Sequence, residues 1–300
     1  MSMESLQRRI KTTQDLRDIV STMKSLSSVS ILQYDQAGIA LEQYLKNILD
    51  AFHALIKADT FSPPPQKPKP KTIKTLAVVI GSDNGLVGKF NKEIVNKAAE
   101  VIEADGETLK DSLFITIGKR VAVMAEQKGA PLFAKYAISN SIKVVNSIAG
   151  TVIIRIEEAM RLHRVNRVLV FFHKRETGQP TQIEQIKLIP FPEKAYANLS
   201  RKPWPTNNIP MVTIPAEEML STLIREYLMI LLSSALTYSL AAEHHARMVN
   251  MQNAEKNIDE SLEQMNQEYQ QKRQEAITEE LIDVVSGSEA ITVKKARPKK

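Results

Sequence analysis

The 300-residue sequence contains no cysteine, which excludes disulfide bonds and zinc–thiolate sites and gives no sign of an oxidising compartment. The N-terminus leads directly into a charged segment, without the apolar region of a secretion signal. None of the five histidines has an acidic partner at the spacing of metal ligands, and no nucleophile–base arrangement is recognisable. We therefore predict no catalytic residue, no cofactor and no bound metal.

Proline and glycine are missing from two long segments. Residues 216–286 contain neither over 71 positions, and a helix of that length would extend over roughly 105 Å. Residues 1–37 also lack both, and after Gly38 the run resumes as far as Ser62. Because globular helices usually span only about 8–20 residues, we predict two long terminal helices that pack on each other or project from the molecule.

Apolar residues in both segments follow narrow stripes that are typical of coiled coils. Near the C-terminus they recur at alternating steps of three and four, with Glu255 interrupting the stripe: Ala241, His244, Met248, Met251, Ile258, Leu262, Met265 and Tyr269. Near the N-terminus the stripe is more ragged: Leu6, Ile10, Leu16, Ile19, Val20, Met23 and Leu26. We favour a coiled coil within one chain over two core-facing amphipathic helices, and periodicity leaves its parallel or antiparallel direction open.

The sequence also lacks a long apolar run. Its longest uncharged stretch, residues 227–242, has 16 residues and includes Ser, Thr and Tyr. A membrane-spanning helix needs about 20 predominantly apolar residues. We interpret the stretch as the buried root of the C-terminal helix and expect no insertion into a membrane.

The formal net charge of +6 depends on the end of the chain. Residues 294–300 carry five positive charges and no negative one, which leaves +1 for the rest. The folded body therefore gives no indication of a basic nucleic-acid-binding surface. We interpret the basic tail, residues 288–300, as a solvated end, with contact to an acidic surface as the alternative.

The middle of the chain has a different pattern. Residues 61–72 form a Pro/Lys-rich segment that we interpret as an extended linker. After it, apolar strands at 75–82, 113–118, 167–173 and 182–189 alternate with helices at 91–104, 119–128 and 142–162, which predicts a small α/β domain with a mainly parallel sheet. We therefore divide the chain into five predicted parts: an N-terminal shaft helix at 1–60, the linker at 61–72, the α/β domain at 73–212, a C-terminal shaft helix at 213–287 and the basic tail at 288–300.

A glycine-rich turn follows the first predicted strand at residues 81–89. It resembles a phosphate-binding loop, but Asp83 occupies the place of a required glycine and Phe90 follows Lys89 where Ser or Thr would hold magnesium. We interpret the segment as a turn between a strand and a helix, and a nucleotide site is the less favoured alternative.

Three blocks of sequence are similar to the gamma subunit of rotary F-type ATP synthases. Arg8–Ile10 and Thr22–Lys24 resemble the start of that family, and its central turn is resembled by Ser82, Asp83, Gly85, Leu86, Gly88 and Asn91. The most specific block matches the family's last helix: Glu243, Ala246–Met248, Met251, Asn253–Ala254, Asn257, Arg273–Gln274, Ala276–Thr278, Glu280–Leu281 and Val285–Gly287. The chain departs from the family at Asn84, which replaces an Arg, at Lys89, which replaces a Gly, and in its longer linker and additional tail.

The resemblance implies an antiparallel coiled-coil shaft with a central Rossmann-like α/β domain. It implies a rotor that couples ion flow to ATP synthesis or hydrolysis, without chemistry of its own. The expected partners are the alpha and beta subunits, epsilon and the membrane c-ring, with no nucleic acid, on the cytoplasmic face of a bacterial inner membrane. The implied contacts with beta are Met23, Arg247, Gln274 and Thr278, and the implied apolar collar is Ile282, Val284 and Val285.

Two other functions are compatible with the pattern. A coiled-coil tether or adaptor with an α/β head would form a stable homodimer through its seam. An α/β nucleotide enzyme would bind a nucleotide as an isolated chain, which the imperfect phosphate loop argues against.

Overall fold

The computed structural model describes residues 2–58, 73–138, 141–175, 180–190, 199–208 and 210–295. The predicted linker, residues 61–72, lies outside these ranges, as do the last five residues of the predicted tail. The described chain forms two compact units, Met1–Ser25 with Val249–Lys300 and Leu26–Met248. We call them the terminal unit and the central unit.

Two long helices contribute to both units, α1 (Met3–Lys57) and α6 (Ala216–Lys295). They occupy the two segments without Pro and with little Gly, as the sequence predicts. α6 continues past Gly287 to Lys295, so the predicted boundary at 287 falls inside the helix.

The central unit contains a five-stranded sheet with the order β3-β2-β1-β4-β5. Its strands are β1 (Thr75–Ile80), β2 (Leu113–Ile117), β3 (Leu132–Tyr136), β4 (Arg167–Lys174) and β5 (Gln182–Ile189). All neighbours pair in parallel except β4 and β5, which are antiparallel. The prediction of a mainly parallel sheet is confirmed, although it omitted β3, a short edge strand of partly exposed residues.

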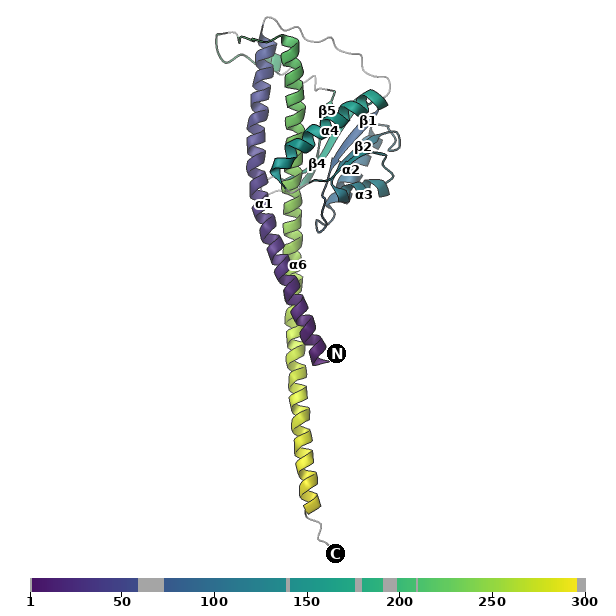
Figure 1. Cartoon of the computed structure of the whole chain (residues 1–300), viewed down its shortest axis with the longest axis vertical. Coiled ribbons are helices and arrows are strands. Elements are labelled where there is room, and N and C mark those ends of the chain that lie inside the picture. Colours follow the sequence, from purple (N-terminus) through teal and green to yellow (C-terminus); the bar gives the residue numbers. More distant parts are fainter. Residues whose placement is uncertain are drawn as a thin grey trace. The chain divides into compact units, whose positions relative to one another are not determined.

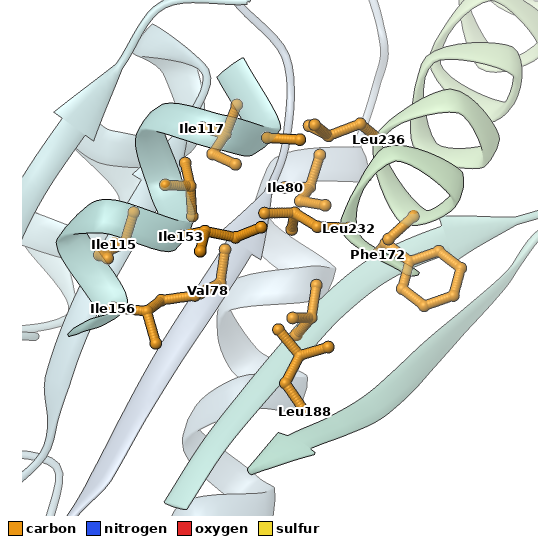
Figure 2. Close-up of a cluster of buried hydrophobic side chains, with 14 of the residues drawn as sticks. Val78, Ile80, Ile115, Ile117, Ile153, Ile156, Phe172, Leu188, Leu232 and Leu236 are labelled. Atoms are coloured by element: carbon orange, nitrogen blue, oxygen red, sulfur yellow. The ribbon is translucent and has the colours of Figure 1, made fainter. Parts of the chain in front are cut away.

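Helices cover both faces of this sheet, and β1, which is apolar from Leu76 to Ile80, is buried throughout. α2 (Phe90–Ala104) and α3 (Lys119–Gln127) pack on one face, against the side of β1 that carries Ala77 and Val79. α4 (Ile142–His163) and α6 pack on the other face, where Leu232 and Leu236 contact the strands (Figures 1 and 2). The long helix is therefore also a layer of the α/β domain.

This packing explains the apolar character of α6. By length and composition, the helix contains a window apolar enough to be a candidate membrane span. In the structure, however, Leu232, Ala235, Leu236 and Leu240 of this stretch are buried in the main core. The stretch is the buried root that the sequence predicts.

The terminal unit is an antiparallel helix pair. Leu6 and Ile10 of α1 form an apolar cluster with Leu262 and Met265 of α6, and Arg17 bonds to Asp259 at 2.5 Å. Further along α1, Lys24 pairs with Glu255. Because partners on α6 move toward lower numbers as those on α1 rise, the helices run in opposite directions, which the periodicity alone left open.

The predicted α1 stripe is only partly right. Leu6 and Ile10 are buried, but Leu16, Ile19 and Leu26 are half or more exposed. The helix instead turns smaller and polar residues toward its partner, and Ser27 is buried. By contrast, the α6 stripe is confirmed at Met251, Leu262 and Met265.

Candidate subunit-contact surfaces

The end of α6 in the terminal unit is uncovered by α1. The cluster with Leu6 and Ile10 extends to Tyr269, and every described side chain from Arg273 to Val285 is exposed except the half-buried Ala276. This part of the helix therefore contributes little to the fold, and its side chains are available to a partner.

Two predicted polar contacts lie on this uncovered part. Gln274 and Thr278 are exposed and four residues apart, so they share one face of the helix with Ile282. The Thr278 hydroxyl donates to the Gln274 carbonyl oxygen at 2.8 Å, while nothing in the described contacts of Gln274 occupies its side-chain amide. The amide can therefore both donate to and accept from a partner.

The predicted apolar collar lies beside them and is larger than predicted. Ile282 is 59% exposed and Val284 is 70% exposed, and Val285, Ile277 and Leu281 are also largely exposed. We call these five residues the apolar end. Positions 277, 281, 284 and 285 lie on one side of a helix. This spacing is visible in the sequence and could have added Ile277 and Leu281 to the predicted collar. Grouped apolar side chains at a surface mark an interaction site.

Met23 lies apart from these residues on α1, in the same unit. Its side chain is partly buried, next to Lys24. Lys24 reaches Glu255, the residue that interrupts the α6 stripe, and this hydrogen bond lowers the pKa of the Glu255 carboxyl. The acidic residue that interrupts the apolar stripe of α6, Glu255, is thus paired with a lysine of α1, Lys24.

Arg247 belongs to the central unit and is not a surface residue. Only 5% of it is exposed, and its Nη2 donates to Glu243 Oε1 at 2.5 Å. Its Nη1 lies 3.4 Å from Nδ1 of the buried His244. The structure therefore does not bring Arg247 together with Gln274 and Thr278, and its contact with a beta subunit stays a prediction.

Arg247, Glu243, His244 and Tyr34 form what we call the polar cluster. Tyr34 of α1 stacks on His244 with ring centroids 5.6 Å apart. Three buried atoms of the cluster have no hydrogen-bond partner among the described residues: Tyr34 Oη, Glu243 Oε2 and His244 Nε2. Burying polar groups without hydrogen-bond partners costs free energy, so burial destabilises the charged forms of the residues in the polar cluster.

Burial shifts the pKa values of three residues in the polar cluster. Burial raises the pKa of Glu243 to about 7, against the lowering effect of Arg247, and Asp83 adds to the rise. Burial and Arg247 together lower the pKa of His244 to about 4. Burial, with Glu243, raises the pKa of Tyr34 to about 12. Near neutral pH, His244 and Tyr34 are uncharged while Glu243 is close to its midpoint.

The turn after β1 uses its polar groups internally. The Ser82 amide donates to Asn91 Oδ1 at 2.9 Å, and Asn91 Nδ2 donates to Ser82 Oγ at 2.8 Å. Asp83 Oδ1 accepts from the backbone amides of Lys119 at 2.8 Å and Ile138 at 3.1 Å. The turn therefore ties β1 to the segments after β2 and β3, and a carboxylate already placed there would repel a phosphate.

Glycines shape the same turn. Gly88 has a positive φ of 61°, as does Leu86 at 66°, while Gly85 lies between them and the strand. Gly118, which the sequence analysis missed, has φ 121°, and a Cβ there would lie 2.8 Å from the Ser82 carbonyl oxygen. The predicted turn motif therefore connects strands and helices of the sheet domain.

Within the ranges that the structure describes, no three His, Cys, Asp or Glu residues are grouped as metal ligands.

Comparison with known proteins gives concordant matches along the whole chain. A family model described as ATP synthase matches residues 2–291. The "ATP synthase gamma chain" of Geotalea uraniireducens is 25% identical over 292 residues, covering 97% of this chain and 99% of the relative. The gamma chain of Persephonella marina is 27% identical over 299 residues, with the same coverages.

Solved structures share the fold. The rotor of the Euglena gracilis mitochondrial ATP synthase aligns with a TM-score of 0.61 at 16% identity, over 92% of this chain and 98% of that one. A chain from the OSCP/F1/c-ring structure of the same synthase gives 0.62 at 15% identity, over 99% and 97%.

Proposed function

The chain belongs to the ATP synthase family whose relatives are gamma chains, and from that premise we propose that it is the central-stalk rotor of an F-type ATP synthase. The observation that carries the proposal is the family match over residues 2–291, which includes both long helices and the α/β domain. The rotor would couple ion-driven rotation of a membrane ring to ATP synthesis or hydrolysis.

We propose that the chain contributes conformational coupling and no catalytic group. The chemistry would belong to beta subunits in a ring with alpha subunits, and the asymmetric rotor would favour a different site conformation at each angle. The α/β domain would contact epsilon and the c-ring. The internally satisfied turn at Ser82 and Asp83 supports a role without a bound nucleotide.

The uncovered end of α6 is our candidate for contact with the alpha–beta ring. Gln274 and Thr278 would form polar contacts with beta, and the apolar end would turn within an apolar collar. Met23 would add a contact from α1. Arg247 could join only after its guanidinium leaves Glu243.

We further propose a peripheral position on the cytoplasmic face of a bacterial inner membrane. The bacterial gamma chains that match nearly the whole chain support this location.

A one-residue insertion tests the rotor against the tether. An Ala inserted after Glu260 turns the rest of α6 by about 100°, which moves Leu262 and Met265 out of their cluster with α1. A rotor should then lose coupled ion transport in the reconstituted complex, whereas a tether, which depends on reach, should keep it. The matched control is an Ala inserted after Pro205, where Pro205 and Thr206 are exposed and lie outside the helices and strands. Full coupled transport by the Glu260 insertion would overturn the proposal.

Co-purification supplies an independent test. A tagged full chain expressed in its native host should recover alpha and beta subunits in stoichiometric amounts. Recovery of the chain as a homodimer without them would favour the tether.

A further inference from the structure

The polar cluster of the central unit encloses a guanidinium group together with a carboxyl group. Arg247 is 5% exposed and Glu243 is 1% exposed, and Arg247 Nη2 donates to Glu243 Oε1 at 2.5 Å. The two residues are four positions apart on α6, so they share one face of the helix. Because a buried guanidinium needs a charged partner, the position of Arg247 depends on the ionisation of this carboxyl.

The pair is incompletely satisfied on both sides. Glu243 Oε2 is buried without a hydrogen-bond partner among the described residues. Arg247 Nη1 lies 3.4 Å from Nδ1 of His244, which is long for a hydrogen bond. A guanidinium can only donate, so this nitrogen of His244 is the acceptor and carries no compensating charge. Among the described contacts of Arg247, the bond to Glu243 Oε1 is the charge-assisted one.

A second carboxyl group acts on the pair from the turn after β1. Burial raises the pKa of Glu243 to about 7, Arg247 lowers this pKa, and the carboxylate of Asp83 raises it. Asp83 is itself held in place, because its Oδ1 accepts from two backbone amides. One guanidinium therefore faces two carboxyl groups, and Glu243 is the one whose proton exchanges near neutral pH.

The other ionisable groups around the pair are uncharged near neutral pH. From α1, Tyr34 stays protonated because burial and Glu243 raise its pKa to about 12. On α6, burial and Arg247 lower the pKa of His244 to about 4, and on β4 burial lowers the pKa of His173 to about 3. These groups do not change their charge between pH 6 and 8, so the charge of the cluster changes there through Glu243.

Arg247 lies at the margin of the buried part of α6. Its neighbours in sequence, Ala246 and Met248, are partly exposed, and Val249 is 39% exposed. Arginine side chains near a surface keep their stem on the protein and place the charged group in water. A change of rotamer would therefore carry the guanidinium from the cluster to solvent.

We propose that the Glu243–Arg247 pair is a latch that one proton opens, so that protonation of Glu243 releases the Arg247 guanidinium to the surface of α6. The proton comes from solvent and binds to the carboxylate, which becomes a neutral acid. The hydrogen bond from Nη2 then loses its charge-assisted part, and the cation is left buried without a charged partner. That the released guanidinium contacts a beta subunit rests on the proposed function; the latch itself does not.

Modification of arginine side chains by phenylglyoxal tests the latch in the full chain. Glu243→Gln keeps the shape of the side chain and removes its charge, and mass spectrometry identifies each modified arginine. At pH 8 about one tenth of Glu243 is protonated, so Arg247 should react about five- to tenfold faster in this variant than in wild type. An unchanged rate at Arg247 overturns the proposal.

A pH series on the wild-type chain tests the same step without a substitution. The exposed Arg8 serves as the reference, because the reagent itself reacts more slowly as pH falls. The rate at Arg247 relative to Arg8 should rise from pH 8 to pH 6, as the protonated fraction of Glu243 grows from about one tenth to about nine tenths. The ratio should be flat in Glu243→Gln. A ratio that is flat in wild type contradicts the latch.

Two controls separate the latch from general loosening of the fold. Arg167 is also buried, at 9% exposure, and its modification rate should stay low in Glu243→Gln. Glu158→Gln breaks a partly exposed pair with Arg155 on α4 and should leave the rate at Arg247 unchanged. An equal rise at Arg167, or an equal rise at Arg247 caused by Glu158→Gln, overturns the proposal.

ATP turnover by the assembled complex gives the functional readout. At pH 8 the complex with Glu243→Gln should hydrolyse ATP about two- to fivefold faster than wild type, because a released guanidinium can bond to a beta subunit. At pH 6 the two rates should agree, since Glu243 is then mostly protonated in wild type as well. With Arg247→Met in both chains, the difference at pH 8 should disappear.

The two readouts fail in different ways. If the wild-type chain supports no ATP turnover, the proposed function fails while the modification rates still decide the latch. If the modification rates support the latch but the two complexes differ equally at both pH values, contact of the released guanidinium with a beta subunit is overturned.

Discussion

The two parts of α6 invert the usual relation between polarity and burial. In the central unit, the helix buries charged and polar side chains, Glu243, His244 and Arg247. In the terminal unit, it exposes Leu281, Ile282 and Val284. Burying charge costs stability unless it is paired, and exposing apolar surface is unfavourable until a partner covers it. The contrast indicates that the first region is shaped by the fold and the second by an interaction outside the chain.

Removal of Arg247 should have the largest effect on stability. Arg247→Ala removes the charge-assisted hydrogen bond to the buried Glu243 carboxyl, which then binds a proton, and we expect a loss of about 2–3 kcal/mol in the free energy of unfolding. Denaturant unfolding of the full chain measures it. Arg155→Ala serves as the control: it removes solvent-exposed contacts with Glu158 and Tyr136, and it should change the free energy of unfolding far less.

A double variant then separates folding from subunit contact. Glu243→Leu/Arg247→Met replaces the buried pair with apolar side chains and should recover most of the stability. If an assembled complex that contains this variant turns over ATP at the normal rate, Arg247 makes no functional contact with a beta subunit. Slowed turnover at restored stability would support the predicted contact.

The pH dependence of stability should reveal the buried carboxyl. The folded pKa of Glu243, about 7, exceeds its ordinary 4.5, so the folded chain binds more protons between these values and this contribution is lost as pH rises from 4.5 to 7. His244 acts oppositely, because its pKa is lowered to about 4 and stability rises with pH from 4 to 6.5. His173, lowered to about 3 by burial, adds to that rise.

Comparison with Glu243→Gln isolates the carboxyl from both histidines. The free-energy difference between wild type and this variant should shift against the wild type by about 2–3 kcal/mol between pH 4.5 and 7. A difference that is flat across this window would show that Glu243 is not buried as described.

The apolar end should show the reverse behaviour. Ile282→Gln/Val284→Gln alters exposed side chains, so unfolding of the free chain should change by less than about 0.5 kcal/mol. Assembly with the alpha–beta ring should weaken by about 1–3 kcal/mol, because apolar area buried in the complex is lost. Titration of the ring subunits measures the second effect. A large loss of stability in the free chain would mean that this region already packs within the fold.

Gln274→Ala should have the smallest effect. Its amide is exposed, so folding should be unchanged, while loss of one partner-bound hydrogen bond of about 1 kcal/mol should slow turnover a few-fold. Thr278→Ser keeps the hydroxyl that donates to Gln274 and serves as the matched control. Equal turnover in wild type and Gln274→Ala would remove this contact.

The sequence predicts the sheet and the long helices because their signals are local. The run from Leu76 to Ile80 is apolar at successive positions, and Met251, Leu262 and Met265 recur at the spacing of a helix face. Periodicity identifies a face but not which face meets a partner, so Leu16 and Ile19 were assigned to the wrong side. The part of α6 that the fold covers and the part that it leaves exposed both carry regularly spaced apolar residues, such as Leu262 and Met265 in the first and Ile277 and Leu281 in the second.

The site was harder to predict because burial is not local. Arg247 lies in a polar stretch of sequence, yet it is buried in the fold, where Tyr34 of α1 stacks on the neighbouring His244. β3 is short and half-exposed, so its five residues give little signal before β2 is placed beside them. Gly118 is required by a carbonyl group that lies far away in sequence, at Ser82.

The antiparallel helix pair has a consequence for synthesis of the chain. Arg17 meets Asp259 across a sequence separation of 242 residues. At translation rates of about 5–20 residues per second, α1 would wait roughly 12–50 s for the helix that covers Leu6 and Ile10. α1, which is made long before α6, is thus among the last helices to find its partner, and contacts of such separation slow folding. Protection of the nascent N-terminal helix is therefore a demand that this architecture places on the cell.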